Sequence, residues 1–342
     1  MKKTRVAING FGRIGRAFFR AAYGNEHFEI VAVNDLGDLE NLAYLLKYDT
    51  VYGGLPFDVS YEAGKMRVDG TAMNCLSIRD PKELPWKDLN VDIVVEATGV
   101  FASYEKAKVH LESGAKRVVV SAPIKDDPET AGVQGATVLM GVNDDALKTC
   151  QISSNASCTT NAASPLIAIL KDSVGVEKAL LNTIHAYTAT QSLVDGPNKK
   201  DFRKGRAAAQ NIIPSTTGAA IATTKAHTEL EGKFDGISMR VPVPVGSLVD
   251  ITFVAKKDTT AEKINDILRE AAASPAWSPR FAVTEEPIVS SDIVGAGFGA
   301  IADLSFTRVV GGNLVKVLGW YDNESGYTQT LVEHVETVSK HV

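Results

Sequence analysis

A glycine-rich stretch near the start of the chain limits the folds that this sequence can adopt. Residues 6–16 consist of an apolar β-like run, a Gly-x-Gly-x-x-Gly turn and the beginning of a helix. In such a unit Gly10 permits the tight turn, Gly12 lets backbone amides approach a pyrophosphate, and Gly15 lets the helix pack closely on the strand. The unpaired amides at the helix N-terminus also favour an anion. The stretch therefore predicts an α/β sheet that binds a dinucleotide.

The residues that follow the turn support this interpretation. A second strand is predicted over residues 29–34 and leads into Asp35, 20 residues beyond Gly15. A carboxylate at this place binds the adenosine ribose hydroxyls, and it would repel the 2′-phosphate of NADP. We therefore expect NAD as the cofactor. The alternative is that the glycines make only a tight turn and that Asp35 only caps a loop.

The first half of the chain alternates short apolar runs with helical stretches. A hairpin with Ala63-Gly64 at its turn is predicted between residues 57 and 69. The other strands are expected to be nearly continuous in apolar residues, as in a parallel sheet buried on both faces. This half is therefore expected to form a doubly wound, Rossmann-type α/β domain. The predicted strands cover residues 5–9, 29–34, 91–97, 117–121, 137–142 and 151–154.

The second half has a different pattern, typical of an α+β domain with a mostly antiparallel sheet covered on one side. The apolar spacing over residues 326–341 predicts a terminal helix that packs back on the first domain. We expect residues 1–157 with 325–342 to form an NAD-binding domain and residues 158–324 to form the other domain. The elements that carry the pattern are strands over 248–254 and 313–320 and a helix opened by a capping box at 259–262.

Composition excludes several other classes of protein. The length of 342 residues suggests two domains, and 44% hydrophobic with 23% charged residues is typical of a globular chain. A net charge of −5 offers no bulk attraction to nucleic acid, so no such partner is expected. The apolar run at the N-terminus is too short for a signal peptide or a membrane span. Three cysteines without CxxC spacing predict neither a disulfide scaffold nor a zinc site, which favours the cytoplasm.

One of the three cysteines has neighbours that suggest reactivity. Cys158 follows a β-like run and precedes the helix-like residues 162–170, so a strand-to-helix turn is expected there. Free amides and the helix dipole at such a turn would stabilise a thiolate. Pro165 leaves open whether the helix is kinked or starts at Ser164. His185, 27 residues further on, is the candidate base, and the alternative is that both residues are ordinary buried side chains.

Taken together, these motifs resemble phosphorylating glyceraldehyde-3-phosphate dehydrogenase. The resemblance is carried by residues 8–16, 45–49, 154–161 and 320–324, and it runs from about residue 4 to residue 335. It implies that Cys158 attacks the aldehyde, that a hydride passes to NAD and that inorganic phosphate cleaves the resulting thioester. His185 would accept the hemithioacetal proton. The second domain would then be catalytic, in a cytoplasmic homotetramer of glycolysis or gluconeogenesis.

The same resemblance implies three sets of binding residues. The attacking phosphate would be bound by Ser157, Thr159, Thr217 and Gly218, and the phosphate of glyceraldehyde 3-phosphate by Thr188, Lys204 and Arg240. The cofactor would be bound by Gly10, Gly12, Arg13, Ile14, Gly15, Asp35, Arg79, Ser121 and Asn323, of which Asn323 would orient the nicotinamide carboxamide.

The chain departs from the family pattern at several positions. Ala162 stands where a second cysteine is common, and Thr190 replaces a frequent Asp. Lys204 replaces an Arg, so that a bidentate phosphate contact becomes a point charge. Gly196 replaces a Leu associated with NAD preference. The charged loop over residues 190–206, which includes Lys200, would contact a neighbouring subunit.

Two alternative functions are compatible with parts of the sequence. Oxidation of erythrose 4-phosphate would use the same cysteine and histidine, although Ala186-Tyr187-Thr188 is similar to the triose-specific form. A non-catalytic protein that binds dinucleotides or nucleic acid would need no Cys–His pair. For nucleic acid it should also have a basic surface, which the net charge of −5 disfavours.

Overall fold

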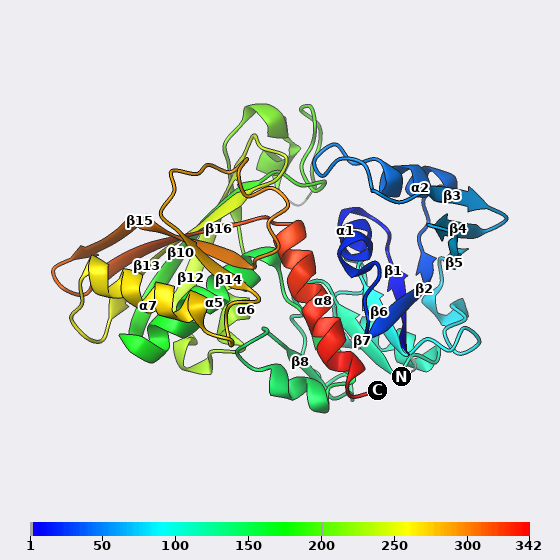
Figure 1. Cartoon of the computed structure of the whole chain (residues 1–342), viewed down its shortest axis with the longest axis horizontal. Coiled ribbons are helices and arrows are strands. Elements are labelled where there is room, and N and C mark those ends of the chain that lie inside the picture. Colours follow the sequence, from blue (N-terminus) through cyan, green and yellow to red (C-terminus); the bar gives the residue numbers. More distant parts are fainter. Residues whose placement is uncertain (1–2, 200) are drawn as a thin grey trace. The chain divides into compact units, whose positions relative to one another are not determined.

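The computed structural model describes residues 3–199 and 201–342, so Lys200 lies outside the described residues (Figure 1). The chain divides into two compact units, one made of Met1–Ala156 with Thr328–Val342 and the other of Ser157–Tyr327. Ser157 and residues 325–327 thus group with the second unit. Helix α8 (Ser325–Ser339) begins in the second unit and ends in the first.

The first unit is built on a sheet that, over the described residues, has nine strands in the order β3-β4-β5-β2-β1-β6-β7-β9-β8. Neighbours from β5 to β8 pair in parallel, whereas β3, β4 and β5 form an antiparallel edge. The strands are β1 (Thr4–Asn9), β2 (Phe28–Asn34), β3 (Val59–Glu62), β4 (Lys65–Val68), β5 (Thr71–Leu76), β6 (Ile93–Glu96), β7 (Arg117–Val120), β8 (Gly135–Thr137) and β9 (Ile152–Ser154). The helices are α1 (Arg13–Ala22), α2 (Leu39–Lys47), α3 (Tyr104–Ala107) and α4 (Val109–Glu112).

The predicted α/β class is confirmed, and most of the predicted strands are present. All four residues of β6 are buried, as expected for a strand covered on both faces. The strand predicted over residues 137–142 is wrong, because β8 ends at Thr137. Leu139 is fully buried in a turn instead, where its N–H donates to the Asn143 side chain at 2.8 Å. The apolar run therefore indicates that side chains are buried, and it does not indicate an extended backbone.

The second unit has a mixed sheet, with seven strands among the residues described, in the order β11-β12-β10-β13-β16-β15-β14. Most neighbours pair antiparallel, and the pairs β10–β12 and β14–β15 are parallel. The strands are β10 (Val176–Ala186), β11 (Ile213–Thr216), β12 (Phe234–Val241), β13 (Ser247–Ala255), β14 (Phe281–Thr284), β15 (Ala300–Val310) and β16 (Leu314–Tyr321). The helices are α5 (Cys158–Ser173), α6 (Ala219–Thr224) and α7 (Ala261–Ala273).

Two helix starts that the sequence left open or misplaced are clear in the structure. Helix α5 begins at Cys158 and continues through Pro165, so it does not start at Ser164. Helix α7 is capped by Thr260, whose Oγ1 accepts from the Lys263 amide at 3.2 Å. The capping box predicted to open at residue 259 is therefore shifted by one residue.

Candidate active site

Cys158 and His185 lie within hydrogen-bonding distance of each other in the second unit. Cys158 is the first residue of α5, and Ser157 caps that helix by accepting from the Thr160 amide at 3.2 Å. His185 lies near the end of β10, and its Nε2 is 3.4 Å from the Cys158 Sγ. The structure thus brings together two residues that are 27 positions apart, as the sequence predicted for a nucleophile and its base.

Arg240 stands on the other side of the histidine ring. The parallel pairing of β10 with β12 places Arg240 directly beside His185 in the sheet. The Arg240 Nη1 is 2.7 Å from the His185 Nδ1, and it donates to the Ala186 carbonyl oxygen at 3.0 Å. The His185 Nδ1 is also 2.7 Å from that oxygen. A proton on Nδ1 would donate to Ala186 and leave the Nε2 lone pair facing the sulfur, whereas a lone pair on Nδ1 would accept from Arg240, which can only donate.

Burial and the Arg240 charge together set the protonation of this pair. Burial, followed by the Arg240 guanidinium, lowers the pKa of His185 from 6.5 to about 3, so the ring is neutral at neutral pH. Burial raises the pKa of the Cys158 thiol, and Arg240 is the largest influence in the opposite direction. The backbone amides of Cys158 and Thr159 at the helix N-terminus lower the pKa of the thiol, as the sequence predicted, but burial has the larger effect. The pair is therefore a thiol next to a neutral base.

Tyr321 is a member of the site to which the sequence assigned no role. Its hydroxyl is 2.9 Å from the Thr159 Oγ1 and 2.7 Å from the Thr183 Oγ1, and its side chain is 1% exposed. Its ring meets the His185 ring edge to face, with centroids 5.9 Å apart. Tyr321 thus links α5, β10 and β16 beside Cys158 and His185. It lies in the Trp320–Glu324 motif, and this motif was the signal from which the sequence could have identified Tyr321 as a site residue.

The other residues predicted to bind phosphate lie at element ends and in loops of the second unit. The Thr159 side chain is buried and turned toward Tyr321, and the Thr188 Oγ1 is 2.9 Å from the Thr190 Oγ1. Thr217 precedes α6, where its Oγ1 accepts from the Ala219 amide at 3.2 Å. The other two are Gly218, with open space around its α-carbon, and Lys204, which is half-buried in a 3-10 turn.

In the first unit, the glycine turn opens onto a cavity of about 390 Å³. Gly10 has a φ of +97°, which an L side chain rarely adopts, and no atom lies within 4 Å of a Cβ built on Gly12. Asp35 accepts from the Phe11 amide at 2.6 Å and from the Gly37 amide at 2.8 Å, which holds the carboxylate beside the turn. These features fit a bound dinucleotide. The predicted residues that line the cavity are Gly10, Gly12, Asp35 and Arg79.

The remaining predicted cofactor residues have other surroundings. Arg13 forms an ion pair with Asp49, with 2.5 Å between Nη1 and Oδ2, and Ile14 is half-buried on α1. A Cβ on Gly15 would lie 2.1 Å from the Gly10 carbonyl oxygen, so this glycine permits the close packing of α1. The backbone N–H of Ser121 donates to the Glu96 carbonyl at 2.9 Å.

Asn323 lies in the second unit and is 5% exposed. Its Oδ1 accepts from the Ser247 hydroxyl at 2.9 Å and from the Gly246 amide at 3.2 Å. These two contacts hold the carboxamide group in one orientation.

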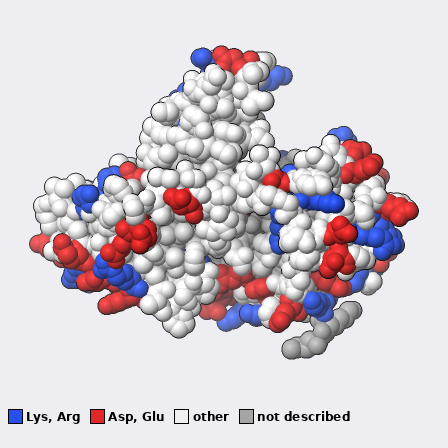
Figure 2. Space-filling view, turned by 45° about the horizontal axis from the view of Figure 1, so that its top comes forward, with Lys and Arg blue, Asp and Glu red and all other residues white. Residues whose placement is uncertain are grey.

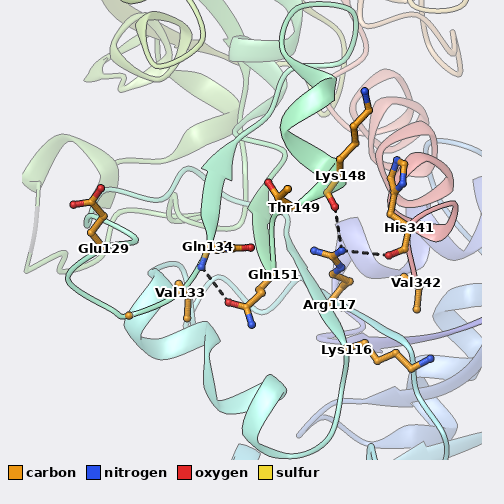
Figure 3. A pocket seen from close by; sticks show the side chains of 11 residues that line it. Lys116, Arg117, Glu129, Val133, Gln134, Lys148, Thr149, Gln151, His341 and Val342 are labelled. Atoms are coloured by element: carbon orange, nitrogen blue, oxygen red, sulfur yellow. Dashed lines mark hydrogen bonds between the residues drawn. The ribbon is translucent and has the colours of Figure 1, made fainter.

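A wider cavity of about 850 Å³ in the first unit contains neither the glycine turn nor the Cys–His pair (Figure 3). Arg117 stands at its centre and donates to the carbonyl oxygens of Cys150, Lys148 and His341. The guanidinium is thus used to hold the C-terminal residues, and we assign this cavity no part in the chemistry.

Among residues 3–199 and 201–342, no helix is both long enough and apolar enough to cross a membrane.

Comparisons with known proteins identify the family of this chain. The family profile "Glyceraldehyde 3-phosphate dehydrogenase, NAD binding domain" matches residues 4–104, and the profile of the C-terminal domain of the same family matches residues 157–323. Glyceraldehyde-3-phosphate dehydrogenase 2 of Streptomyces avermitilis is 47% identical over 332 residues, which cover 96% of each chain. The enzyme of Mycobacterium avium is 48% identical over 345 residues, covering 98% of this chain and 99% of that one. The chain therefore belongs to the glyceraldehyde-3-phosphate dehydrogenase family.

Proposed function

We propose that this chain oxidises and phosphorylates glyceraldehyde 3-phosphate to 1,3-bisphosphoglycerate with NAD, using Cys158 as the nucleophile and His185 as the base. The observation that carries the assignment is the 3.4 Å separation of Sγ and Nε2 at the N-terminus of α5. Family membership supports the substrate and the cofactor. A neutral imidazole within reach of a thiol provides the general base that the chemistry requires.

The reaction begins when Sγ bonds to the aldehyde carbon. The thiol proton passes by way of the His185 Nε2 to the carbonyl oxygen, which gives a hemithioacetal. His185 then takes the hydroxyl proton while the same carbon loses a hydride, so that a thioester remains on Cys158. NAD, when bound, supplies the acceptor for that hydride. Inorganic phosphate attacks the thioester carbon, the C–S bond breaks, and the acyl phosphate leaves. The released sulfur takes up the proton of the phosphate, and His185 gives its proton to water.

Arg240 is proposed to hold the phosphate of the substrate together with Thr188 and Lys204. Because its Nη1 is 2.7 Å from the His185 Nδ1, a phosphate bound to the guanidinium would offset the positive charge that disfavours an imidazolium. Substrate binding would therefore make His185 a stronger base. The backbone and hydroxyl donors of Ser157, Thr159, Thr217 and Gly218 are proposed to bind the attacking phosphate.

The NAD-binding role of the first domain is supported by the cavity at the glycine turn. Gly10 and Gly12 would admit the pyrophosphate, and Asp35 would accept from the ribose hydroxyls. We propose that Asn323 orients the nicotinamide carboxamide. Five further residues, Arg13, Ile14, Gly15, Arg79 and Ser121, are proposed to shape or contact the cofactor site.

A homotetramer is proposed because the second unit exposes large apolar side chains. In the charged loop and just after it, Leu193 is 78%, Phe202 86% and Ile212 70% exposed. On the sheet, Leu180 of β10 is 67% and Ile237 of β12 is 51% exposed. The loop is green at the top of Figure 1, and Figure 2, which brings that top forward, shows a broad surface with few charged side chains. Such surfaces mark contacts between subunits.

We propose a cytoplasmic location, because a glycolytic enzyme works there and because Cys75, Cys150 and Cys158 are all free thiols.

The function is tested by mixing purified protein with glyceraldehyde 3-phosphate, NAD and inorganic phosphate and following the absorbance of the reduced cofactor. We expect turnover that requires phosphate or arsenate. Turnover that is indifferent to both would contradict the thioester step. Parallel assays with erythrose 4-phosphate and with NADP should give lower kcat/KM values, and faster oxidation of the tetrose would support the alternative substrate.

A further inference from the structure

A carboxylate is buried directly behind the wall of the dinucleotide cavity. Glu96, the last residue of β6, is 1% exposed. Its Oε2 accepts from the Asn9 Nδ2 at 2.6 Å and lies 3.0 Å from the His110 Nε2. Its Oε1 accepts from the Thr98 amide at 2.8 Å and from the Thr98 hydroxyl. A charge removed from water in this way needs several hydrogen bonds to compensate its lost solvation.

The indole of Trp86 determines which way these bonds run. The Trp86 Nε1 can only donate, and it lies 3.2 Å from the His110 Nδ1. Nδ1 therefore accepts, and the proton of the neutral ring is on Nε2, which donates to Glu96. All the partners of the carboxylate are then donors, which is the arrangement that an ionised glutamate satisfies.

From Glu96 the hydrogen bonds continue into one wall of the cavity. With its Nδ2 directed at Glu96, Asn9 turns its Oδ1 to the Asn34 Nδ2, at 2.8 Å. Asn34 in turn accepts from the Ile78 amide at 2.9 Å and donates to the Ile78 carbonyl at 3.0 Å. Asn9, Asn34, Ile78 and the adjacent Arg79 all line the cavity.

The contact between the Glu96 Oε1 and Thr98 connects the carboxylate to the glycine turn. Thr98 also lines the cavity, and its amide nitrogen would lie only 2.6 Å from a Cβ on Gly10. The Thr98 hydroxyl accepts from the Val100 amide at 3.0 Å while it donates to Glu96. One carboxylate thus orients both the segment at residues 78–79 and the segment at residues 98–100.

We propose that Glu96 is a positioning residue for NAD binding, whose acceptor-only carboxylate sets the direction of the Asn9–Asn34–Ile78 hydrogen bonds and thereby the shape of the cofactor cavity. This inference uses the cofactor of the proposed function but not its substrate or its catalytic pair. It is measured by binding of NAD in the absence of turnover, so its failure is distinct from failure of the proposed reaction.

An amide in place of the carboxylate cannot satisfy these partners. In Glu96→Gln the oxygen must face the Thr98 N–H, so the NH₂ group faces the donors of Asn9 and His110. Turning the Asn9 amide would force Asn34 to turn as well, and a donor of Asn34 would then face the fixed Ile78 N–H. Changing the tautomer of His110 would place a donor against Trp86. Each of these two changes leaves a donor facing a second donor that cannot reverse its role, either the Ile78 N–H or the Trp86 Nε1–H.

Placing the carboxylate at residue 9 in place of residue 96 should restore the hydrogen bonds that lead to the cavity. In the double variant Asn9→Asp/Glu96→Gln, the NH₂ group of the introduced glutamine donates to the introduced aspartate. That aspartate also accepts from Asn34, which keeps its original orientation, and the net charge of the chain is unchanged. The His110–Trp86 branch remains unsatisfied, so the double variant should stay less stable than the native chain while it regains affinity for NAD.

The experiment measures the NAD dissociation constant by calorimetry and the thermal unfolding midpoint for the native full-length chain, Glu96→Gln, the double variant and Trp86→Phe. We expect Glu96→Gln to weaken NAD binding about tenfold or more, from the loss of buried hydrogen bonds, and to raise KM for NAD with little change in kcat. The double variant should recover most of that affinity. Trp86→Phe, the matched control on the other branch, should lower the midpoint but keep the native affinity.

The proposal is overturned if Glu96→Gln binds NAD within about twofold of the native chain, a change too small for a lost buried hydrogen bond. It is also overturned if affinity follows the unfolding midpoint across all the variants, as a purely structural role requires. If Glu96→Gln does not fold, the double variant is compared with Asn9→Asp, in which two carboxylates face each other. Tighter NAD binding by the double variant then supports the proposal, and equal or weaker binding overturns it.

Discussion

Two glycines of the same turn should respond in opposite ways to the addition of one methyl group. At Gly12 a Cβ meets no atom within 4 Å, and the backbone φ of −69° suits any residue. At Gly15 a Cβ would lie 2.1 Å from the Gly10 carbonyl oxygen, which is backbone and has little freedom to move. Gly12→Ala should therefore affect the ligand, whereas Gly15→Ala should affect the fold.

The expected magnitudes follow from these surroundings. Gly12 is the N-cap of α1, where alanine is modestly worse than glycine, so Gly12→Ala should change the free energy of unfolding by less than about 1 kcal/mol. Its methyl group would occupy the space of the pyrophosphate, and the loss of one hydrogen bond to a charged group, about 1.5–3 kcal/mol, weakens binding roughly 10- to 100-fold. Gly15→Ala should lower the free energy of unfolding by about 1–3 kcal/mol through overpacking.

The two variants are compared by urea unfolding and by calorimetric titration with NAD. Gly12→Ala should unfold at nearly the native urea midpoint and bind NAD weakly. Gly15→Ala should unfold at a clearly lower midpoint. Native NAD affinity in Gly12→Ala, or an equal loss of stability in both variants, would refute the reasoning.

Four further predictions concern Cys158, His185, the buried histidines and Tyr321. Cys158→Ser should lose nearly all turnover and still bind NAD, and substantial remaining turnover would rule out the nucleophile assignment. His185→Asn should slow alkylation of Cys158 at neutral pH, because the neutral base that accepts the thiol proton is removed; an unchanged rate would count against the pairing. Burial holds the pKa of His185, His227 and His334 at about 3, about 4 and about 3, below the ordinary 6.5, so the unfolded chain binds more protons below about pH 6.5. Stability should then fall on acidification from about pH 6.5 toward pH 4, by up to about 1.4 kcal/mol per pH unit for each histidine, and urea unfolding that is unchanged from pH 7 to pH 5 would contradict this. Tyr321→Phe should lower the free energy of unfolding by about 1–3 kcal/mol, because two buried threonine hydroxyls lose a partner, and an unchanged urea midpoint would argue against that contribution.

The elements that sequence patterns located correctly are those whose pattern is local. The strand over residues 5–9, the Ala63-Gly64 hairpin and the terminal helix each follow from side-chain periodicity and turn residues within a dozen positions. The apolar residues 138–142 were misassigned because burial in a turn and burial in a strand need the same side chains. Strand β12 was missed because Gly236 and alternating polar residues weaken its pattern.

The candidate site likewise has residues that local sequence patterns predicted and contacts that depend on elements far apart in the chain. Cys158 and His185 were predicted from residue type, spacing and a family resemblance. The position of Arg240 against the His185 ring depends on the pairing of β10 with β12, two strands separated by about 50 residues of chain. The raised pKa of the thiol depends on burial, to which elements far apart in the sequence contribute.

Two predictions follow from the sequence alone: a glycine turn followed by an acidic residue indicates a dinucleotide site, and a cysteine at a helix start indicates covalent chemistry. These features are local because they depend on the conformational freedom of glycine and on the amides of a single helix turn. The charges and hydrogen-bond partners at these two places depend on the tertiary structure. The Arg240–His185 contact, the Tyr321 hydroxyl and the carboxylate of Glu96 behind the cofactor cavity each require side chains from separate strands and helices to meet in a buried space. In such a space, the packing of separate elements determines which groups form hydrogen bonds and which charges lie close together. The neighbours of a residue in the chain do not determine this.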